Sequence, residues 1–321
     1  MTDLSPFSKG NPNLRRVWDA TTLSDFLKDP ASYYLKRVKG WSPIFPRPPL
    51  VYGVMLQGGL ERYDKIRATG SSDDGLEAAI EYAVEEAKHP LGFEYSLDEI
   101  SREFGKDNQK NHRTLKTLLR TFVWYQQEYG GDEDSARILL MNGEPAVEVP
   151  FRIPLPIKTP YGENYILAGH MDAAVDLFGN KFVLERKHTL TTLSKYYFDG
   201  WKANTQFSTY AMVGSAVLGE QVDGILLDAV QVGVSFSRFH RREILRTKGQ
   251  QDEFLNNIML WIKQAEYMAE NDHWPINEGG LSMYGGSSFR KILTLDPAHR
   301  EQYLHENFKQ EEPWNPLIER P

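Results

Sequence analysis

The sequence predicts an α/β protein with a mixed central sheet, flanking helices and a helical N-terminal region. Three observations support this prediction: helical spacing of apolar residues over roughly the first 135 residues, strand-like alternation after residue 146, and a later helix–strand–helix order. The chain has 321 residues, of which 40% are hydrophobic and 25% charged, so it can bury a sizeable core. We expect one domain over residues 1–321.

Charge and cysteine content narrow the function classes. The formal net charge of −7 argues against a protein that coats nucleic acid non-specifically, although a local basic groove is compatible with it. The absence of cysteine excludes disulfides and thiolate metal sites. The N-terminal residues contain no apolar run that resembles a signal peptide, and no stretch approaches a membrane span. We therefore expect a cytoplasmic protein with no membrane partner.

The N-terminal part of the chain is predicted to be mostly helical. Residues 1–20 are polar and are expected to form an extended lead-in. A helix with its N-cap at Thr22 or Ser24 follows, and Pro30 interrupts it. Beyond a proline-rich loop, the expected helices are residues 51–67, the segment from the break at 71–75 to about 88, and residues 111–130. We expect residues 51–135 to form a helical region inserted before the sheet.

The middle of the chain carries the predicted strands. Residues 146–157 alternate as a strand does, and residues 165–189 have the pattern of a hairpin with its turn near Phe178–Asn180. Residues 194–219 return to helical spacing. A buried or sheet-edge strand at 222–236 and an amphipathic helix at 250–271 follow. Residues 272–321 are expected to be an irregular C-terminal segment packing on the N-terminal region.

Three charged residues of the predicted hairpin indicate chemistry. Side chains alternate faces along a strand, so Glu185 and Lys187 share one face and Arg186 lies on the other. Pairing across the turn brings Asp172 beside Glu185. Neighbouring carboxylates repel each other unless a cation lies between them, and Mg²⁺ or Mn²⁺ prefers such oxygen ligands. The pattern therefore indicates a metal site that polarises a phosphate and activates water, with Lys187 assisting.

An exposed strand face with an incidental salt bridge is the alternative for these residues, because an acidic residue two positions before a lysine is common by chance. The flanking strand residues are apolar, among them Ile166, Val175 and Val183. The segment is therefore not a generally solvated one, and the metal-site interpretation is favoured.

Three short motifs, in order, resemble those of the PD-(D/E)xK nuclease superfamily. They are GHMD at 169–172, LERKHT at 184–189 and QFSTY at 206–210. They are most similar to the RecB-type branch, which includes the CRISPR-associated adaptation exonucleases and many phage-encoded nucleases. That branch shows GxxD, a second acidic residue with xK, and QxxxY on a helix. The resemblance extends from about Leu23 to Pro316, and the three motifs together are more specific than any one of them.

The resemblance implies a restriction-endonuclease-like fold, a single nuclease domain and a role for each matched residue. Asp172 and Glu185 would be metal ligands and Lys187 the catalytic lysine. Gln206 and Tyr210 lie one helical turn apart and would face the site and contact the nucleic-acid backbone. The alternative for Tyr210 is a half-buried aromatic residue with a satisfied hydroxyl.

The function implied by the resemblance is a Mg²⁺- or Mn²⁺-dependent deoxyribonuclease, and more narrowly an exonuclease of recombination, repair or phage DNA processing. Its partners would be DNA, as single strands or duplex ends, and a recombination or replication protein. Its compartment would be the host cytoplasm if a phage encodes it. The alternative is a nuclease-like fold that binds DNA or a protein without cutting.

One departure from the family pattern concerns the metal ligands. The branch has GxxxHxxLE on an early helix, with the His as a further ligand, whereas this chain has GVMLQGGLE at 53–61. Gln57 stands at the position of the His, and Glu61 is kept one turn away. An amide oxygen is acceptable to Mg²⁺. Gln57 and Glu61 are therefore expected to complete the metal shell, and a structural or surface acid is the alternative for Glu61.

A second departure is the missing cysteines. Many relatives bind an iron–sulfur cluster through one cysteine near the N-terminus and three near the C-terminus. The matching positions here are Asp29, Leu281, Ser287 and Leu293. Without thiolates this chain holds no such cluster. The two chain ends are then expected to be held together by packing of Tyr33, Tyr284, Phe289 and nearby apolar residues.

Basic residues beyond the motifs are candidates for DNA contact. Arginines crowd into residues 237–246, directly after a predicted strand. Arg238, Arg241 and Arg242 form a candidate phosphate-contacting edge, and a solvated loop is an equal alternative.

Aromatic and histidine side chains near the motifs have mixed interpretations. The cations and aromatics of residues 195–202 suit base stacking, but Trp201 is expected in the core. His170 and His188 flank the acidic residues, and neither is expected to be a ligand.

Overall fold

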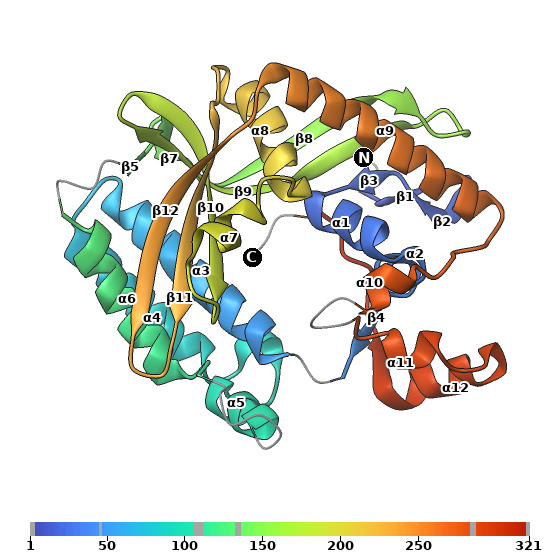
Figure 1. Ribbon diagram of the computed structural model, residues 1–321, viewed down its shortest axis with the longest axis horizontal. Coiled ribbons are helices and arrows are strands. Elements are labelled where there is room, and N and C mark those ends of the chain that lie inside the picture. Colours follow the sequence, from blue (N-terminus) through green and yellow to red (C-terminus); the bar gives the residue numbers. More distant parts are fainter. Residues whose placement is uncertain (1–3, 45–46, 106–111, 132–135, 283–286, 319–321) are drawn as a thin grey trace. The chain divides into compact units, whose positions relative to one another are not determined.

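The computed structural model describes residues 4–44, 47–105, 112–131, 136–282 and 287–318. These residues form a mixed α/β structure in which helices flank a mixed sheet (Figure 1). The chain divides into two compact units. Unit 1 comprises residues 1–45, 150–169 and 248–321, and unit 2 comprises residues 46–149 and 170–247. Within the described ranges, no helix is both long and apolar enough to cross a membrane.

Unit 2 combines a sheet with two groups of helices. Its strands, besides the first residues of β8 (Val147–Lys158), are β5 (Ala136–Ile138), β6 (Leu140–Met141), β7 (Glu144–Pro145), β9 (Asn164–Leu177) from residue 170 onward, β10 (Asn180–Thr189), β11 (Gly224–Val232) and β12 (Ser237–Leu245). Its helices are α3 (Pro48–Arg67), α4 (Ser72–Glu86), the 3-10 helix η2 (Pro90–Gly92), α5 (Leu97–Gly105), α6 (Leu115–Tyr129), α7 (Lys195–Asp199) and α8 (Thr205–Leu218).

The sheet of unit 2 is mixed. Strand β10 pairs antiparallel with β9 and parallel with β11, while β12 pairs antiparallel with β11 and β5 pairs antiparallel with β9. Strand β11 therefore lies between two partners, and all nine of its residues are buried. The parallel β10–β11 pair requires a crossover connection, which α7 and α8 provide.

The β9–β10 hairpin and its predicted turn are confirmed. Phe178 and Gly179 both have positive φ, at 52° and 87°, the conformation of a type I′ turn whose twist matches that of the strands. The antiparallel pairs run from Leu177–Asn180 at the turn to Ala173–Leu184, which is one pair short of Asp172 and Glu185. The local turn chemistry thus fixes the register that brings the two motifs together.

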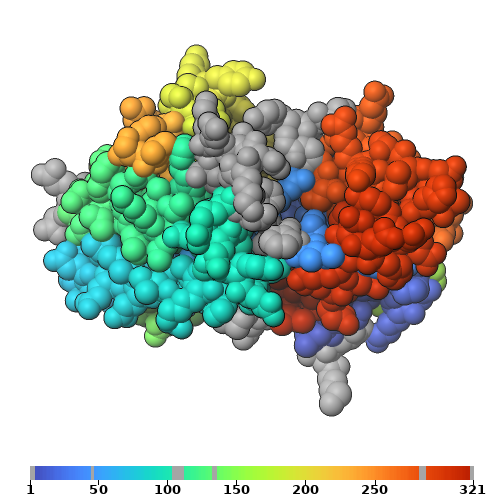
Figure 2. Space-filling view, turned by 90° about the horizontal axis from the view of Figure 1, so that it is seen from below, coloured from blue at the N-terminus to red at the C-terminus, as the bar shows by residue number. Residues whose placement is uncertain are grey.

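Helices α3 to α6 form a layer that shares a core with the sheet. Their buried apolar side chains pack with Val230 and Val232 of β11. The predicted apolar face of α3, with Leu56, Leu60 and Tyr63, is buried in this core. The outer sides of α4, α5 and α6 form the cyan-to-green surface of unit 2 in Figure 2. Helix α5 was not predicted.

The helix predicted over residues 194–219 is instead two helices. Helix α7 ends at Asp199, and α8 begins after Asn204, whose side-chain oxygen accepts the N–H of Phe207 at 3.1 Å. On α8, a Cβ at Gly214 would lie 3.0 Å from the side chain of Val183 on β10. This close approach seats α8 on β10 and so places the QFSTY motif near the strand.

Unit 1 contains the rest of β8 (Val147–Lys158), the first residues of β9 and elements from both ends of the chain. Its other strands are β1 (Phe7–Ser8), β2 (Asn11–Arg15), β3 (Val17–Trp18), β4 (Trp41–Pro43) and β13 (Phe308–Gln310). Its helices are α1 (Ala20–Lys28), α2 (Pro30–Tyr33), the π-helix η1 (Tyr34–Val38), α9 (Lys248–Glu270), α10 (Glu278–Ser282), α11 (Arg290–Leu293) and α12 (Pro297–Asn307).

The cap predicted for the first helix was wrong. Its N-cap is Asp19, whose Oδ1 accepts the N–H of Thr22 at 2.5 Å, so neither Thr22 nor Ser24 caps it. The first 20 residues, predicted as an extended lead-in, include a strand of the sheet, because β3 pairs in parallel with β9. The predicted interruption at Pro30 is confirmed: α1 ends before it and α2 starts at it.

Two other sequence predictions need correction. Residues 237–246 are not a loop, because β12 pairs with β11 along nine residues. The C-terminal residues include a regular helix, α12, which Asp296 caps by accepting the N–H of Ala298 at 2.9 Å. Pro297 at its first turn has no N–H to satisfy, which suits that position.

The two chain ends share a core within unit 1. Ala31 and Trp41 pack in one apolar cluster with C-terminal residues that include Phe289, and β13 pairs with β4. Tyr33 stacks on Trp18 with ring centroids 5.5 Å apart. Tyr284 lies outside the described residues.

The positions matched to the missing cysteines have other contacts in unit 1. The Ser287 and Ser32 hydroxyls are 2.8 Å apart, and Asp29 accepts the N–H of Asn277 at 2.6 Å. Leu281 and Leu293 are buried.

Candidate active site

Asp172 and Glu185 lie buried where the β9–β10 pairing ends. They are 5% and 1% exposed, respectively. Beyond the last backbone pair, a side chain of β9 accepts the next backbone N–H of β10. The Asp172 Oδ2 accepts the N–H of Arg186 at 3.0 Å. The end of the ladder thus supplies a hydrogen bond that orients one of the two carboxylates.

Lys187 connects Glu185 to helix α8 through a chain of hydrogen bonds. Its ammonium contacts Glu185 Oε1 and donates to Gln206 Oε1 at 2.9 Å. Gln206 Nε2 donates to the Tyr210 hydroxyl at 3.1 Å, and that hydroxyl donates to the carbonyl of His170 at 2.7 Å. The structure therefore brings the GHMD, LERKHT and QFSTY motifs into direct contact.

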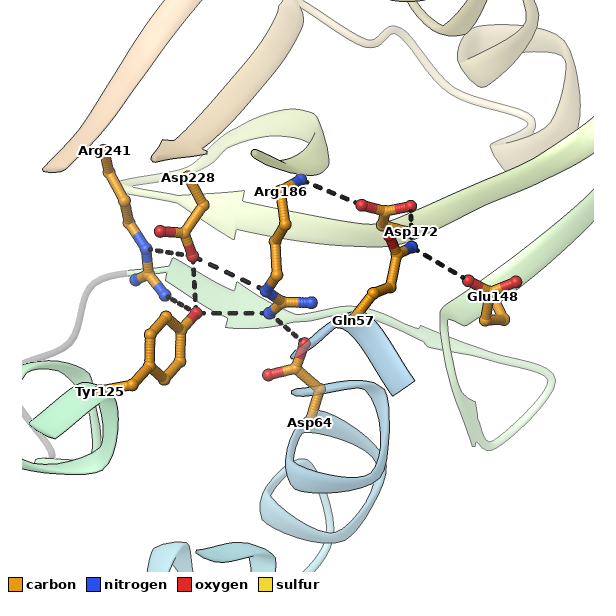
Figure 3. Close-up of polar contacts among 8 residues, drawn as sticks. All are labelled: Gln57, Asp64, Tyr125, Glu148, Asp172, Arg186, Asp228 and Arg241. Carbon is orange, nitrogen blue, oxygen red and sulfur yellow. Dashed lines mark hydrogen bonds and ion pairs between the residues drawn. The ribbon is translucent and has the colours of Figure 1, made fainter. Parts of the chain in front are cut away.

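Helix α3 brings Gln57 and Glu61 to the same place. Gln57 Nε2 donates to Asp172 Oδ1 at 2.5 Å and approaches Glu148 Oε1 at 3.4 Å (Figure 3). Glu61 hydrogen-bonds to Glu148 and lies close enough to Asp172 for their charges to interact. Glu61 is thus part of an acidic cluster, so it is not simply a surface residue.

Glu148 is a site residue that the sequence did not reveal. It lies at the start of β8 with φ 51°, a left-handed conformation that is uncommon for a residue with a side chain. The available signal was an acidic residue inside the otherwise apolar alternation of residues 146–149. That signal does not indicate which distant residues the carboxylate meets.

The pKa values of three carboxyl groups in this cluster, those of Glu61, Asp172 and Glu185, are raised. Burial, and then the charge of Asp172, raise the pKa of Glu185 to about 8 against the opposing effect of Lys187. Burial also raises the pKa of Asp172, and burial and Glu148 together raise that of Glu61. Burial disfavours the ammonium of Lys187, but Glu185 and Asp172 outweigh it and raise its pKa, so Lys187 stays charged.

The donor set fits a hard divalent cation in chemistry. Carboxylate and amide oxygens are the ligands that Mg²⁺ and Mn²⁺ prefer, and Glu185 Oε2 is buried without a hydrogen-bond partner among the described residues. As the side chains stand, however, no three His, Asp or Glu groups in the described part of the chain are arranged to hold a metal. The Gln57 amide group instead bridges Asp172 and Glu148.

The three candidate DNA-binding arginines on β12 separate into two groups. Arg241 donates to Asp228 at 3.3 Å and to the Tyr125 hydroxyl at 3.0 Å, so its guanidinium serves contacts inside the protein. Arg238 is exposed and lies over the ring of Phe236, and Arg242 is half-buried. Arg238 and Arg242 are therefore better placed for phosphate contact than Arg241.

The neighbouring aromatic and histidine residues have protein partners. Trp201 is half-buried, stacks on Phe207 with centroids 5.2 Å apart, and lies 5.8 Å from the Lys187 ammonium. Burial lowers the pKa of His188 to about 4, and its ring packs against Tyr52. His188 is thus a neutral packing residue beside the site.

Comparisons with known proteins do not identify a family or a function for this chain. No family model matches the chain, and a search of curated proteins finds no match. A solved structure titled "Crystal structure of SSO0001" is 10% identical, and the match covers 67% of this chain and 84% of that one, with a TM-score of 0.27. A TM-score this low does not establish a shared fold.

Proposed function

We propose that this protein is a divalent-metal-dependent DNA nuclease of the PD-(D/E)xK type, and more narrowly an exonuclease. The supporting observation is the cluster around Lys187, in which two buried carboxylates, one ammonium and the Gln206–Tyr210 pair are in continuous contact. When both carboxylates are ionised, such a cluster has more negative than positive charge and so favours a bound cation. A restriction-endonuclease-like arrangement of the sheet and α8 belongs to the same proposal.

The proposed metal ligands are Asp172 and Glu185, with Glu61 and Gln57 completing the shell. A Mg²⁺ or Mn²⁺ ion there would supply positive charge beside the scissile phosphate and a bound water of lowered pKa. Ligation by Gln57 requires its amide oxygen, whereas its Nε2 now donates to Asp172. A turn of this amide group would exchange the donor for an acceptor.

Lys187 is proposed to stabilise negative charge that develops on the phosphate. Its raised pKa keeps the ammonium charged at neutral pH, and Glu185 and Gln206 fix its direction. Tyr210 holds Gln206 and the backbone of His170, so it sets the position of the lysine through one intermediate side chain.

The proposed substrate is DNA, as single strands or duplex ends. Gln206 and Tyr210 would contact its backbone beside the reacting phosphate. Arg238 and Arg242 are proposed to add charge that attracts phosphates without reading sequence. A recombination or replication protein is the proposed partner.

Cleavage assays test the function directly. Labelled single- and double-stranded DNA is incubated with the protein and Mg²⁺, Mn²⁺ or EDTA, and substrates blocked at the 5′ or 3′ end define the end requirement. We expect metal-dependent cleavage that Lys187→Ala abolishes. Cleavage that survives this substitution would remove the mechanism proposed here.

A second candidate function is a nuclease-like fold that binds DNA or a protein without cutting. The observation that favours it is Gln57, whose amide group donates to Asp172 and approaches Glu148, so both carboxylates have a hydrogen-bond donor from the protein. DNA binding by the parent protein without cleavage in Mg²⁺ or Mn²⁺ would favour this candidate.

A further inference from the structure

The side of β10 opposite Lys187 carries a buried network of charged side chains centred on Arg186. The Arg186 guanidinium contacts Asp64 of α3 and donates to the Tyr125 hydroxyl of α6 at 3.3 Å (Figure 3). The Tyr125 hydroxyl donates to Asp228 of β11 at 2.6 Å, and Arg241 of β12 contacts both of these residues. One side chain of β10 is therefore connected to α3, α6 and β11 directly, and to β12 through Tyr125 and Asp228.

Asp64 joins this network to the helix that supplies two site residues. Gln57, Glu61 and Asp64 lie on successive turns of α3, at positions that share one helix face. The first two meet the carboxylates of the site, and Asp64, 3% exposed, meets Arg186. The Asp64–Arg186 contact thus fixes α3 against β10 one turn away from the residues that enter the site.

Arg186 also has a direct contact with the site through its backbone. It lies between Glu185 and Lys187, and its N–H donates to Asp172 Oδ2 at 3.0 Å. Any shift of Arg186 moves the N–H that orients Asp172 together with the two flanking side chains. The anchored side chain on one face therefore controls geometry on the other.

We propose that Asp64 and Arg186 are positioning residues that set the spacing between the α3 residues and the β9–β10 carboxylates of the site. The inference rests on the proposed nuclease function for its catalytic consequence. It assigns no contact with substrate to either residue. If the pair is removed, every site residue is still present, but the distance between the α3 residues and the β9–β10 carboxylates is no longer fixed. Small displacements of reacting groups lower reaction rates by large factors.

The test compares Asp64→Asn and Tyr125→Phe with Thr121→Val. Thr121 lies one turn from Tyr125 on α6, is fully buried and hydrogen-bonds to Ser237 at 2.9 Å, but it does not contact Arg186. We expect Asp64→Asn to lower kcat for DNA cleavage by about 10- to 100-fold with KM changed less than about threefold. We expect a several-fold loss for Tyr125→Phe and parental kcat for Thr121→Val in the folded protein.

Hydrogen exchange at the Arg186 amide supplies a readout that needs no activity. We expect it to exchange faster in Asp64→Asn and Tyr125→Phe than in the parent, and at the parental rate in Thr121→Val. Unchanged exchange in the first two, or equal acceleration in all three, would overturn the proposal. If the parent does not cleave DNA, the proposed function fails while this measurement still decides the positioning role. If Asp64→Asn does not fold, Tyr125→Phe and Thr121→Val still decide it.

Discussion

The two sides of strand β10 hold buried charge in opposite ways. On the Arg186 side, two carboxylates face two guanidinium groups: Asp64 and Asp228 with Arg186 and Arg241. On the Lys187 side, four carboxylates interact around one ammonium among the described residues: Glu61, Glu148, Asp172 and Glu185 with Lys187. The first group has as many acidic as basic side chains, whereas the second has four acidic side chains for one basic side chain.

This difference separates a structural cluster from a candidate site. Burial disfavours the charged form of Arg186, but Asp64, Tyr125 and Asp228 outweigh it and raise its pKa well above the usual value. On the other side, burial and mutual repulsion raise the pKa of Glu185 to about 8. Buried carboxylates that repel each other destabilise the fold, and this is why we propose a cation as the ligand of this cluster.

The largest expected effect comes from substituting each central cation in turn. Lys187→Ala should lower the cleavage rate by about 10²- to 10³-fold, because no other described side chain of the cluster would bring positive charge to the phosphate. Arg186→Met should have a smaller effect on the rate, through the positioning role proposed above, and should lower the free energy of unfolding by about 3–5 kcal/mol, because Asp64 and Asp228 lose a buried partner. Cleavage rates and urea unfolding curves measure the two effects.

The distinction between the two sides of β10 would be wrong if Lys187→Ala mainly lowered stability and Arg186→Met mainly lowered the cleavage rate. A Lys187→Ala protein that cleaves normally but unfolds easily would show that Lys187 is the structural cation. Thr121→Val is a suitable control for the unfolding measurement, because Thr121 is a buried polar residue of the same unit outside both groups.

The pH dependence of stability should sharpen the comparison next. The pKa of Glu185 is raised from 4.5 to about 8, so the folded state holds a proton that the unfolded state has lost between these values. Stability of the metal-free protein should therefore fall as pH rises through this window, by a few kcal/mol at most. Glu185→Gln should flatten this dependence. Thermal unfolding in EDTA between pH 5 and 9 measures it.

Added divalent cation provides the matched control for this pH experiment. Mg²⁺ or Mn²⁺ should raise the unfolding temperature most at the alkaline end, where the carboxylates are ionised and free to bind it. Glu185→Gln should reduce that gain. An equal gain in the parent and in Glu185→Gln would show that the ion binds elsewhere.

The sequence predicted the parts of this molecule that depend on local chemistry. The hairpin was predictable because Gly179 and Asn180 are common turn residues and lie between two apolar runs. The alternation of side chains along the strands then placed Asp172 near Glu185. The break between α7 and α8 was missed because the Asn204 cap competes with continued helical spacing, and spacing alone does not show which prevails.

The parts that the sequence did not predict depend on long-range contacts. Glu148 meets Gln57 across 91 positions of the chain, and no local pattern of charge predicts that meeting. Arg186 was correctly expected on the face opposite Lys187, but its side-chain partners come from three other elements, α3, α6 and β11. Periodicity assigns a side chain to a face, whereas its partners follow from the packing of whole elements.

A smaller effect is expected from Tyr210→Phe. This substitution removes the hydroxyl that donates to the His170 carbonyl at 2.7 Å and accepts from Gln206 at 3.1 Å. We expect a several-fold fall in kcat, because Lys187 loses part of its support, and a stability loss of about 1–3 kcal/mol from the two hydrogen bonds. Steady-state kinetics and urea unfolding test this. A kcat equal to that of the parent would make Tyr210 a packing residue.

The smallest effects are expected on strand β12. This strand carries both an arginine of the Arg186 group and arginines proposed to contact DNA, so the two roles can be compared within one segment. Arg238→Ala and Arg242→Ala should each weaken DNA binding a few-fold and reduce the slope of log affinity against log salt by about one phosphate contact. Arg241→Ala should leave that slope unchanged and lower stability by about 1–3 kcal/mol, because Asp228 then depends on Arg186 alone for positive charge. Fluorescence anisotropy across a salt series, with unfolding curves for each variant, separates the two results. If Arg241→Ala changed the slope as much as Arg238→Ala does, its guanidinium would have to leave Asp228 when DNA binds, and the Arg186 group would then be part of the DNA-binding surface.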